Sequence, residues 1–388
     1  MKITSDKEYL AKAAKWAAEV APRRPPNPVL VGVRITATET GAEFAGFDYD
    51  TSHRVKAPAS VLQDGVIVVP GRLLAAVLDR LPPGAVDIVA EEGDSRVTIT
   101  AGRAEIKLPL LRQDDYPTLP AAGAPLLEVD AQEFVAAVKQ VAPVADAANT
   151  DALPALGAIH MEVEVEVEDG GTFLVMYATD RYQFAVTRVP CTLLRGDQPV
   201  SKLSPPAAAV AQFVSVAMGE ASVRFGFDPD NPTLLSLDCG GHVATTRLVD
   251  GGFAQKWRAF AEFAEKASTV AVVEARPLLA ALDRAALVKT PGEGVRMEVD
   301  DAGISLSVGV DASASELVDA TLEGEPGEFL IDPARLYKAV KHAGTAQVRV
   351  GLTNPLKVSV RPVTVKDGGE GSGGRQHWHI IQALRPAG

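Results

Sequence analysis

The chain has 388 residues, and its 38 Lys and Arg against 50 Asp and Glu give a formal net charge of −12 at pH 7. This acidic excess argues against a protein that binds nucleic acid over its whole surface and against a polybasic membrane-surface protein. The length predicts about two to four domains, and 47% hydrophobic residues with only 5% aromatic ones predict cores packed mainly from aliphatic side chains.

Helices are expected wherever apolar residues recur at helical spacing. The six expected helices are residues 5–20, 71–81, 132–142, 204–217, 276–288 and 333–343. Ser204 and Asp332 are interpreted as N-caps, with Pro205 and Pro333 at the first helical position, where the missing N–H costs nothing. The helices alternate between two kinds of unit that return after about 130 residues, which indicates three tandem copies.

Strands are expected between these helices. Residues 97–100 and 104–108 predict a hairpin around Gly102, and 378–383 predict a last strand. Residues 161–168 alternate apolar and Glu, which predicts a half-buried strand with a charged solvent face rather than a carboxylate metal site. Linkers are expected near 116–125 and 249–268.

Other features favour a cytoplasmic protein without a metal, a cofactor or membrane contact. The N-terminus lacks the apolar segment of a signal peptide, and no run of about 18 apolar residues could span a membrane. Cys191 and Cys239 are interpreted as reduced, buried thiols. His377 and His379 could form a metal pair, but alternate histidines are common on exposed edge strands, and no acidic or Cys partner lies nearby.

The combination of motifs in this order resembles the bacterial DNA polymerase sliding clamp, the DNA polymerase III beta subunit, along the whole chain. The segments that carry the resemblance are Arg24–Leu30, Val69–Leu74, Asp114–Pro120, Tyr177–Tyr182 and Arg247–Phe253. The resemblance implies an α+β protein made of three copies of the DNA-clamp fold, each with two helices packed on antiparallel sheets. The implied domains are residues 1–122, 123–252 and 253–388.

The resemblance further implies a head-to-tail homodimeric ring that encircles duplex DNA and gives a polymerase processivity without catalysis. The predicted helices carry about +5 and the rest about −17, which suits a basic inner wall that attracts phosphates without reading bases. The candidate DNA-contacting residues are Arg24, Arg72, Arg80, Lys139, Arg284, Lys338 and Lys341. The second domain's helices are weakly charged, so strong DNA contact is not expected there.

The resemblance also implies a hydrophobic cleft between the second and third domains, where short peptides of DNA polymerase III alpha, the clamp loader and repair proteins dock. Its implied wall is Leu156, Thr179, Arg181, Tyr182, Gln183, Phe184, Trp257, Arg258, Asp332, Arg335, Leu356, Val358, Ile380, Ile381, Gln382, Ala383 and Leu384. Cyclic-peptide antibiotics would bind the same cleft.

The chain departs from the family at this cleft. Arg181 stands where the family has Gly, Ala254 follows Phe253 where Pro is usual, and the C-terminal tail lacks the usual Met-Pro-x-Arg. A changed peptide preference or a lower affinity is therefore expected. Three alternatives remain open: a duplicate, actinobacterial clamp that confers resistance to clamp-binding antibiotics, a repeat-built structural protein without DNA, and an enzyme. The enzyme is disfavoured because no P-loop, Gly-x-Gly-x-x-Gly or Gly-x-Ser-x-Gly motif occurs.

Overall fold

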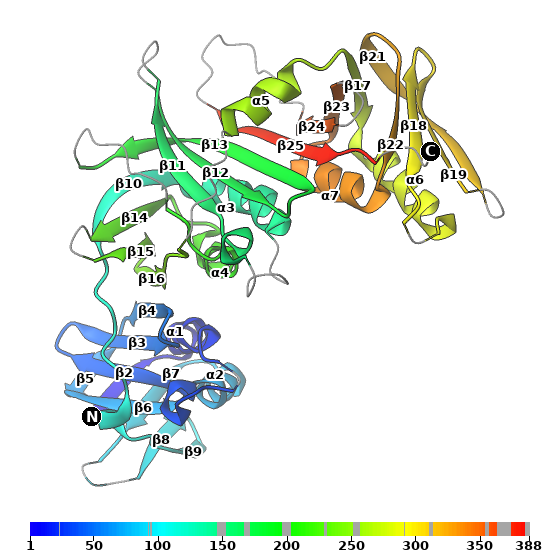
Figure 1. The fold of residues 1–388 in the computed structure, drawn as a ribbon. Coiled ribbons are helices and arrows are strands. Elements are labelled where there is room, and N and C mark those ends of the chain that lie inside the picture. Colours follow the sequence, from blue (N-terminus) through cyan, green and yellow to red (C-terminus); the bar gives the residue numbers. More distant parts are fainter. Residues whose placement is uncertain are drawn as a thin grey trace. The chain divides into compact units, whose positions relative to one another are not determined.

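A computed structural model describes residues 1–22, 24–91, 93, 95–145, 153–166, 171–195, 203–228, 231–250, 257–290, 292–309, 313–353, 357–362 and 374–384 (Figure 1). Its contacts divide the chain into two compact units. Unit 1 comprises Met1–Glu128 with Gly219–Leu248, and unit 2 comprises Val129–Met218 with Val249–Gly388. Leu356 of the implied cleft lies outside the described residues. The division into three domains stays a prediction.

The α-helices of the described residues are α1 Lys7–Glu19, α2 Gly71–Arg80, α3 Ala131–Val141, α4 Ala207–Ala217, α5 Trp257–Glu265, α6 Ala275–Val288 and α7 Pro333–Ala343. All six expected helices are confirmed. The Asp332 cap is confirmed as well, because its carboxyl accepts a hydrogen bond from the Ala334 amide at 3.0 Å. The Ser204 cap is wrong: α4 begins three residues later, and the Ser204 hydroxyl instead lies 2.9 Å from His160 Nδ1.

Unit 1 contains two antiparallel sheets, in the orders β5-β1-β7-β8-β9 and β14-β15-β16-β4-β3-β2-β6. Their strands are β1 Lys2–Asp6, β2 Gly32–Thr38, β3 Gly41–Phe47, β4 Thr51–Ala57, β5 Ser60–Gln63, β6 Gly65–Pro70, β7 Ala85–Val89, β8 Arg96–Ala101, β9 Ala104–Pro109, β14 Ser222–Asp228, β15 Asn231–Cys239 and β16 His242–Arg247. Strand β10 (Ala124–Asp130) crosses the division between the units. The hairpin predicted around Gly102 is confirmed as β8 and β9.

Helix α1 lies directly against β3. A Cβ atom added to Gly46 would lie 1.9 Å from the Ala17 carbonyl oxygen, so glycine is required at this approach of backbone to backbone. Strand β16 pairs with β4, with Thr246 opposite Thr51. Residues that are almost 200 positions apart in the chain thus share one continuous ladder.

Unit 2 is likewise antiparallel. One sheet has the order β21-β17-β23-β24-β25-β13-β12-β11, and a second has the order β20-β19-β18-β22. The strands are β11 His160–Val165, β12 Thr172–Thr179, β13 Gln183–Leu193, β17 Thr269–Glu274, β18 Val295–Asp300, β19 Gly303–Val308, β20 Ala314–Val318, β21 Ala320–Gly324, β22 Gly327–Ile331, β23 Gln347–Thr353, β24 Lys357–Pro362 and β25 Gln376–Gln382. The core under α6 and α7 is almost entirely aliphatic, as the composition predicts.

The acidic strand β11 differs from its expected form. Glu164 is only 14% exposed, and it accepts hydrogen bonds from Arg188 at 2.9 Å and from Arg258 at 2.6 Å. Arg188 also pairs with Glu166 and covers the ring of Phe173. The glutamates therefore neutralise a buried arginine, and the prediction of a freely solvated face is wrong for this pair.

Candidate functional site

The turn between β12 and β13 carries four of the residues implied for the cleft, and its own side chains hold it in shape. The Asp180 carboxyl accepts hydrogen bonds from the backbone amides of Tyr182 at 2.9 Å and Gln183 at 2.7 Å. Thr179 Oγ1 accepts from the Arg181 amide at 3.1 Å and donates to the Gln183 carbonyl at 2.7 Å. Short polar side chains before such a turn replace the hydrogen bonds that the ladder cannot supply.

Arg181 occupies the left-handed region of backbone space, with φ +78°. That conformation is costly for any residue with a Cβ atom, so glycine would adopt it with less strain than arginine does. The Arg181 side chain is exposed, and among the described residues it forms no ion pair. The turn therefore presents a solvated cation next to Tyr182.

Three segments meet around Tyr182, whose side chain is 48% exposed. The guanidinium of Arg335, on α7, lies 4.4 Å from the centre of the Tyr182 ring, a cation–π contact. The amide of Gln382, at the end of β25, donates to the Tyr182 carbonyl at 2.9 Å. Asp332 Oδ2 lies 3.9 Å from Arg335 Nε. The structure thus brings the turn, the start of α7 and the C-terminal strand together.

Six apolar residues of the implied wall are buried. The residues at 0 to 4% exposure are Leu156, Phe184, Val358, Ile380, Ile381 and Ala383. Phe184 stacks on Tyr177, and Ile381 is opposite both Gln183 and Val358 in the sheet. Gln382 is exposed and Leu384 is half-buried. Among the described residues of the wall, the accessible side chains are therefore mostly polar and most apolar ones are buried.

Helix α5 is a feature that the sequence reasoning missed, because its segment was expected to be a linker. Its Ala264 packs in one core cluster with Phe184, Trp378 and Ile380. Arg258 is exposed and binds Glu164 on β11. The side chain of Trp257 lies outside the described part of the structure. The helical spacing of apolar residues in Trp257–Glu265 is the signal that could have identified α5.

The two C-terminal histidines were expected on an exposed edge strand, but the structure places them in the interior of a sheet. Strand β25 lies between β13 and β24, and His377 and His379 are 3% and 0% exposed. Burial lowers the pKa of His377 to about 3 and holds the pKa of His379 well below its usual value, so both imidazoles are neutral near pH 7. His377 Nδ1 lies 2.8 Å from the Thr187 hydroxyl, and His379 Nε2 lies 3.2 Å from Gln183 Oε1.

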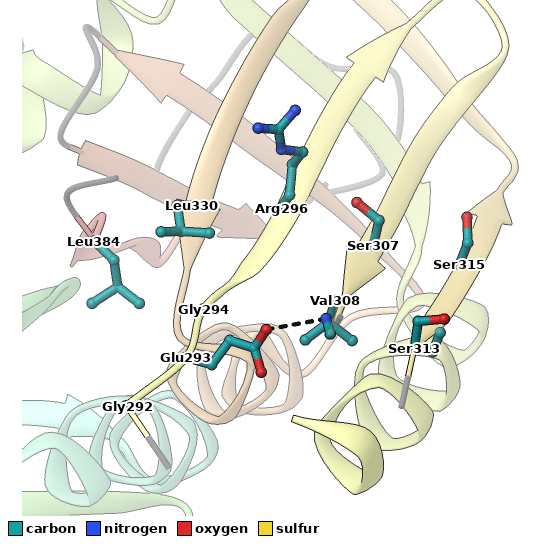
Figure 2. Close-up of a pocket in the computed structure, with 12 residues that line it drawn as sticks. Gly292, Glu293, Gly294, Arg296, Ser307, Val308, Ser313, Ser315, Leu330 and Leu384 are labelled. Atoms are coloured by element: carbon teal, nitrogen blue, oxygen red, sulfur yellow. Dashed lines mark hydrogen bonds between the residues drawn. The ribbon is translucent and has the colours of Figure 1, made fainter. Parts of the chain in front are cut away.

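A separate cavity of about 700 Å³ opens at one end of the β20-β19-β18-β22 sheet (Figure 2). Leu330 and Leu384 line one side, and Ser313 and Ser315 line the other. Glu293 spans it by accepting from the Gly309 amide at 3.1 Å. Leu384 is the residue of the implied cleft that the structure places in this cavity.

The candidate DNA-contacting side chains are all exposed, but they differ in their partners. Arg284 donates two hydrogen bonds to the Glu316 carboxylate, from Nη2 to Oε1 at 2.5 Å and from Nε to Oε2 at 2.8 Å, so its charge is largely neutralised. Arg72 and Arg80 donate to the carbonyls of Ala21 and Ala76, respectively. Arg24 lies in the segment after α1, and Lys139 is in the last turn of α3.

Helix α7 carries the densest positive charge. Lys338 and Lys341 are one turn apart and line a hollow of about 370 Å³ beside α6. Helix α4 has no charged residue at all, in agreement with the weak charge expected there. Helix α1 also carries two exposed cations, Lys12 and Lys15, which the sequence reasoning did not select as candidate DNA contacts. Their exposure on one face, at helical spacing, is the signal that could have identified them.

No group of three or more His, Cys, Asp or Glu among the described residues could hold a metal ion. Within the same residues, no helix is long and apolar enough to cross a membrane. Cys191 and Cys239 are free thiols, half-buried and buried respectively, and burial raises their pKa values to about 12 and about 11.

Comparisons with known proteins agree on one family. Residues 1–120 match the family model of the DNA polymerase III beta subunit, N-terminal domain, and residues 263–368 match that of its C-terminal domain. The chain is 31% identical over 371 residues to the beta sliding clamp of Streptomyces coelicolor, covering 93% of this chain and 94% of that protein. It is 28% identical over 356 residues to the beta sliding clamp homolog GriR of Streptomyces muensis, covering 91% of each. The fold matches the crystal structure of a sliding clamp from Pseudomonas aeruginosa bound to griselimycin, with a TM-score of 0.86, 19% identity and 99% of each chain covered.

Proposed function

This chain belongs to the family of DNA polymerase III beta subunits, the sliding clamps, and on that premise we propose that it encircles duplex DNA as a head-to-tail homodimeric ring. The ring tethers the replicative polymerase and other clamp-binding proteins in the cytoplasm. Its contribution is processivity, so it performs no chemical step and needs no cofactor. The three-domain division and the contact residues named above form part of this proposal.

The distribution of charge is the observation that carries the proposal. Exposed Lys and Arg lie on α1, α2, α3, α6 and α7, in a chain whose net charge is −12. Cations on helix surfaces attract phosphates without reading bases, because the attraction comes from counterion release. An acidic remainder repels DNA from other surfaces. This combination suits a sleeve that must hold DNA and still slide.

A loading assay tests the proposal. Wild-type protein is incubated with clamp loader and polymerase on primed circular DNA, and the length of the products is measured. Long products that depend on the clamp, and a protein that stays on circular DNA but leaves linear DNA, are the expected results. Analytical ultracentrifugation should give about twice the 40.7 kDa chain mass. A monomer at micromolar concentration, or retention that does not depend on closed DNA, would contradict the ring.

We further propose that partner peptides dock at the surface formed by the β12–β13 turn, the start of α7 and the end of β25. The turn and α7 present an aromatic ring and two cations, and β25 ends beside them. Griselimycin, which is bound to the Pseudomonas aeruginosa clamp, is the first probe. Fluorescence anisotropy with labelled griselimycin should show saturable binding. Tyr182→Ala should weaken that binding at least tenfold, because aromatic anchors dominate such sites.

Arg181 supports a second candidate function, a duplicate clamp that resists clamp-binding antibiotics. Its exposed side chain adds bulk and charge at a position that the family fills with Gly. Arg181→Gly should then bind griselimycin more tightly than wild type. Polymerase assays with wild-type clamp should proceed at griselimycin concentrations that stop the variant. Equal inhibition of the two proteins would remove this second function.

A further inference from the structure

Three hydrogen-bonded side chains, the buried His379 and Gln183 and the half-buried Asp180, join the core of unit 2 to the β12–β13 turn. His379 lies in β25 opposite Ala185 of β13 and Val360 of β24, with no exposed surface. Its Nε2 is 3.2 Å from Gln183 Oε1, and Gln183 Nε2 is 2.8 Å from Asp180 Oδ2. Asp180 in turn accepts from the amides of Tyr182 and Gln183.

The chemistry of these groups determines the direction of every hydrogen bond. A carboxylate only accepts, so the amide nitrogen of Gln183 must face Asp180 and its oxygen must face His379. An amide oxygen also only accepts, so His379 must carry its proton on Nε2. Its Nδ1 is then the unprotonated acceptor nitrogen, and it is buried with no hydrogen-bond partner among the described residues. The neutral imidazole protonated on Nε2 is therefore the form that donates to Gln183.

We propose that His379 is a positioning residue for the partner-binding turn: by donating to Gln183, it holds Gln183 and Asp180 in place and so maintains the exposed geometry of Arg181 and Tyr182. This inference rests on the proposed docking of peptides at the turn. His379 touches no partner itself. It acts through two side chains, the second of which caps the turn's backbone.

The surroundings keep His379 neutral. His377 on the same strand and His342 on α7 both disfavour a positive charge on it. Lys338 and Lys341 on α7 contribute to lowering the pKa of His342, and Arg375, which precedes β25, contributes to lowering the pKa of His377. The residues paired with His379 are Ala185 of β13 and Val360 of β24, and Gln183 and Thr187 flank Ala185 on the same face of β13; none of them is charged. Burial and these cations together keep the His379 imidazole neutral, with a single proton, throughout the physiological pH range.

Hydrogen exchange in the full-length dimer tests the positioning directly. The variant His379→Leu removes the donor, and His379→Gln offers an amide donor at a similar reach. His377→Leu is the matched control, because His377 has similar burial on the same strand but bonds to Thr187 rather than Gln183. We expect the Tyr182 and Gln183 amides to exchange about fivefold faster in His379→Leu, as the loss of one hydrogen bond predicts. His379→Gln and His377→Leu should leave these amides near their wild-type rates.

Equal acceleration in His377→Leu and His379→Leu would overturn the proposal, because it would show a loss of core stability rather than of positioning. So would unchanged exchange in His379→Leu. If His379→Leu does not fold, Gln183→Leu removes the bond to His379 together with the bond to Asp180, and it should accelerate the exchange at least as much.

Griselimycin binding provides the functional measurement. His379→Leu should bind the labelled compound about fivefold more weakly, His379→Gln should restore binding to within about twofold, and His377→Leu should bind like wild type. Altered exchange at the turn with wild-type binding in His379→Leu would overturn the role in partner binding. If wild type does not bind griselimycin at all, the proposed peptide site fails while the exchange measurements still decide the positioning.

Discussion

The left-handed backbone of Arg181 allows its strain to be measured by comparing two substitutions. Arg181→Ala keeps a Cβ atom at φ +78°, whereas Arg181→Gly removes it. The left-handed conformation costs an L-residue about 1–2 kcal/mol. Glycine avoids this cost, but the larger conformational entropy of the unfolded glycine chain reduces the gain in stability by about 0.5–1 kcal/mol. Because Arg181 forms no ion pair among the described residues, no Coulombic loss offsets the gain. Arg181→Gly should therefore be more stable than Arg181→Ala by about 1 kcal/mol.

Urea unfolding followed by tryptophan fluorescence measures this difference. With a slope near 3 kcal/mol per molar urea, 1 kcal/mol moves the midpoint by about 0.3 M. Wild type should unfold close to Arg181→Ala, because both keep the strained Cβ atom. Equal midpoints for the Gly and Ala variants, or a Gly variant less stable than wild type, would refute the reasoning that the turn stores strain.

Three further outcomes follow from the same structure. Burial lowers the pKa of His53 to about 4 and of His377 to about 3, so the unfolded chain binds more protons than the folded one below pH 6.5. The Tm should therefore fall steadily as the pH drops from 6.5 toward 4. A flat Tm over that range would contradict the burial of neutral imidazoles. Lys341→Glu should weaken retention on circular DNA and reduce the slope of log affinity against log salt by about 1, and an unchanged slope would show that Lys341 touches no phosphate. Gly46→Ala should cost about 1–3 kcal/mol, measured by urea unfolding, because its Cβ would meet the Ala17 carbonyl at 1.9 Å; wild-type stability would mean that α1 shifts freely.

Local rules predicted the helices well where the deciding interactions are close in sequence. Asp332 followed by Pro333 identifies the start of α7 because capping involves only the next two residues. The same rule failed at Ser204 and Pro205, since Ser204 is engaged by His160, more than forty residues earlier. Helix α5 was missed because a nine-residue helix depends on tertiary packing, here of Ala264 against Phe184 and Ile380.

The resemblance predicted which segments form the accessible surface, and the structure brings Tyr182, Arg335 and Gln382 together. It did not show that Ile380 and Ile381 lie under that surface, because strand alternation gives the face of a residue but not what covers it. The bond from His379 to Gln183 joins residues 196 positions apart, and no local pattern encodes it.

The pairing of β4 with β16 has a consequence for proteolysis and truncation. A fragment ending near residue 122 would retain β4 but lose β16, so the edge of Thr51–Val55 that now pairs with His242–Thr246 would be left open to solvent. An uncovered strand edge is a template for another copy of the same strand. The N-terminal part of the chain is therefore expected to self-associate when it is cut free. Proteases that cleave between the two partners of this ladder would then leave a remnant that is expected to self-associate.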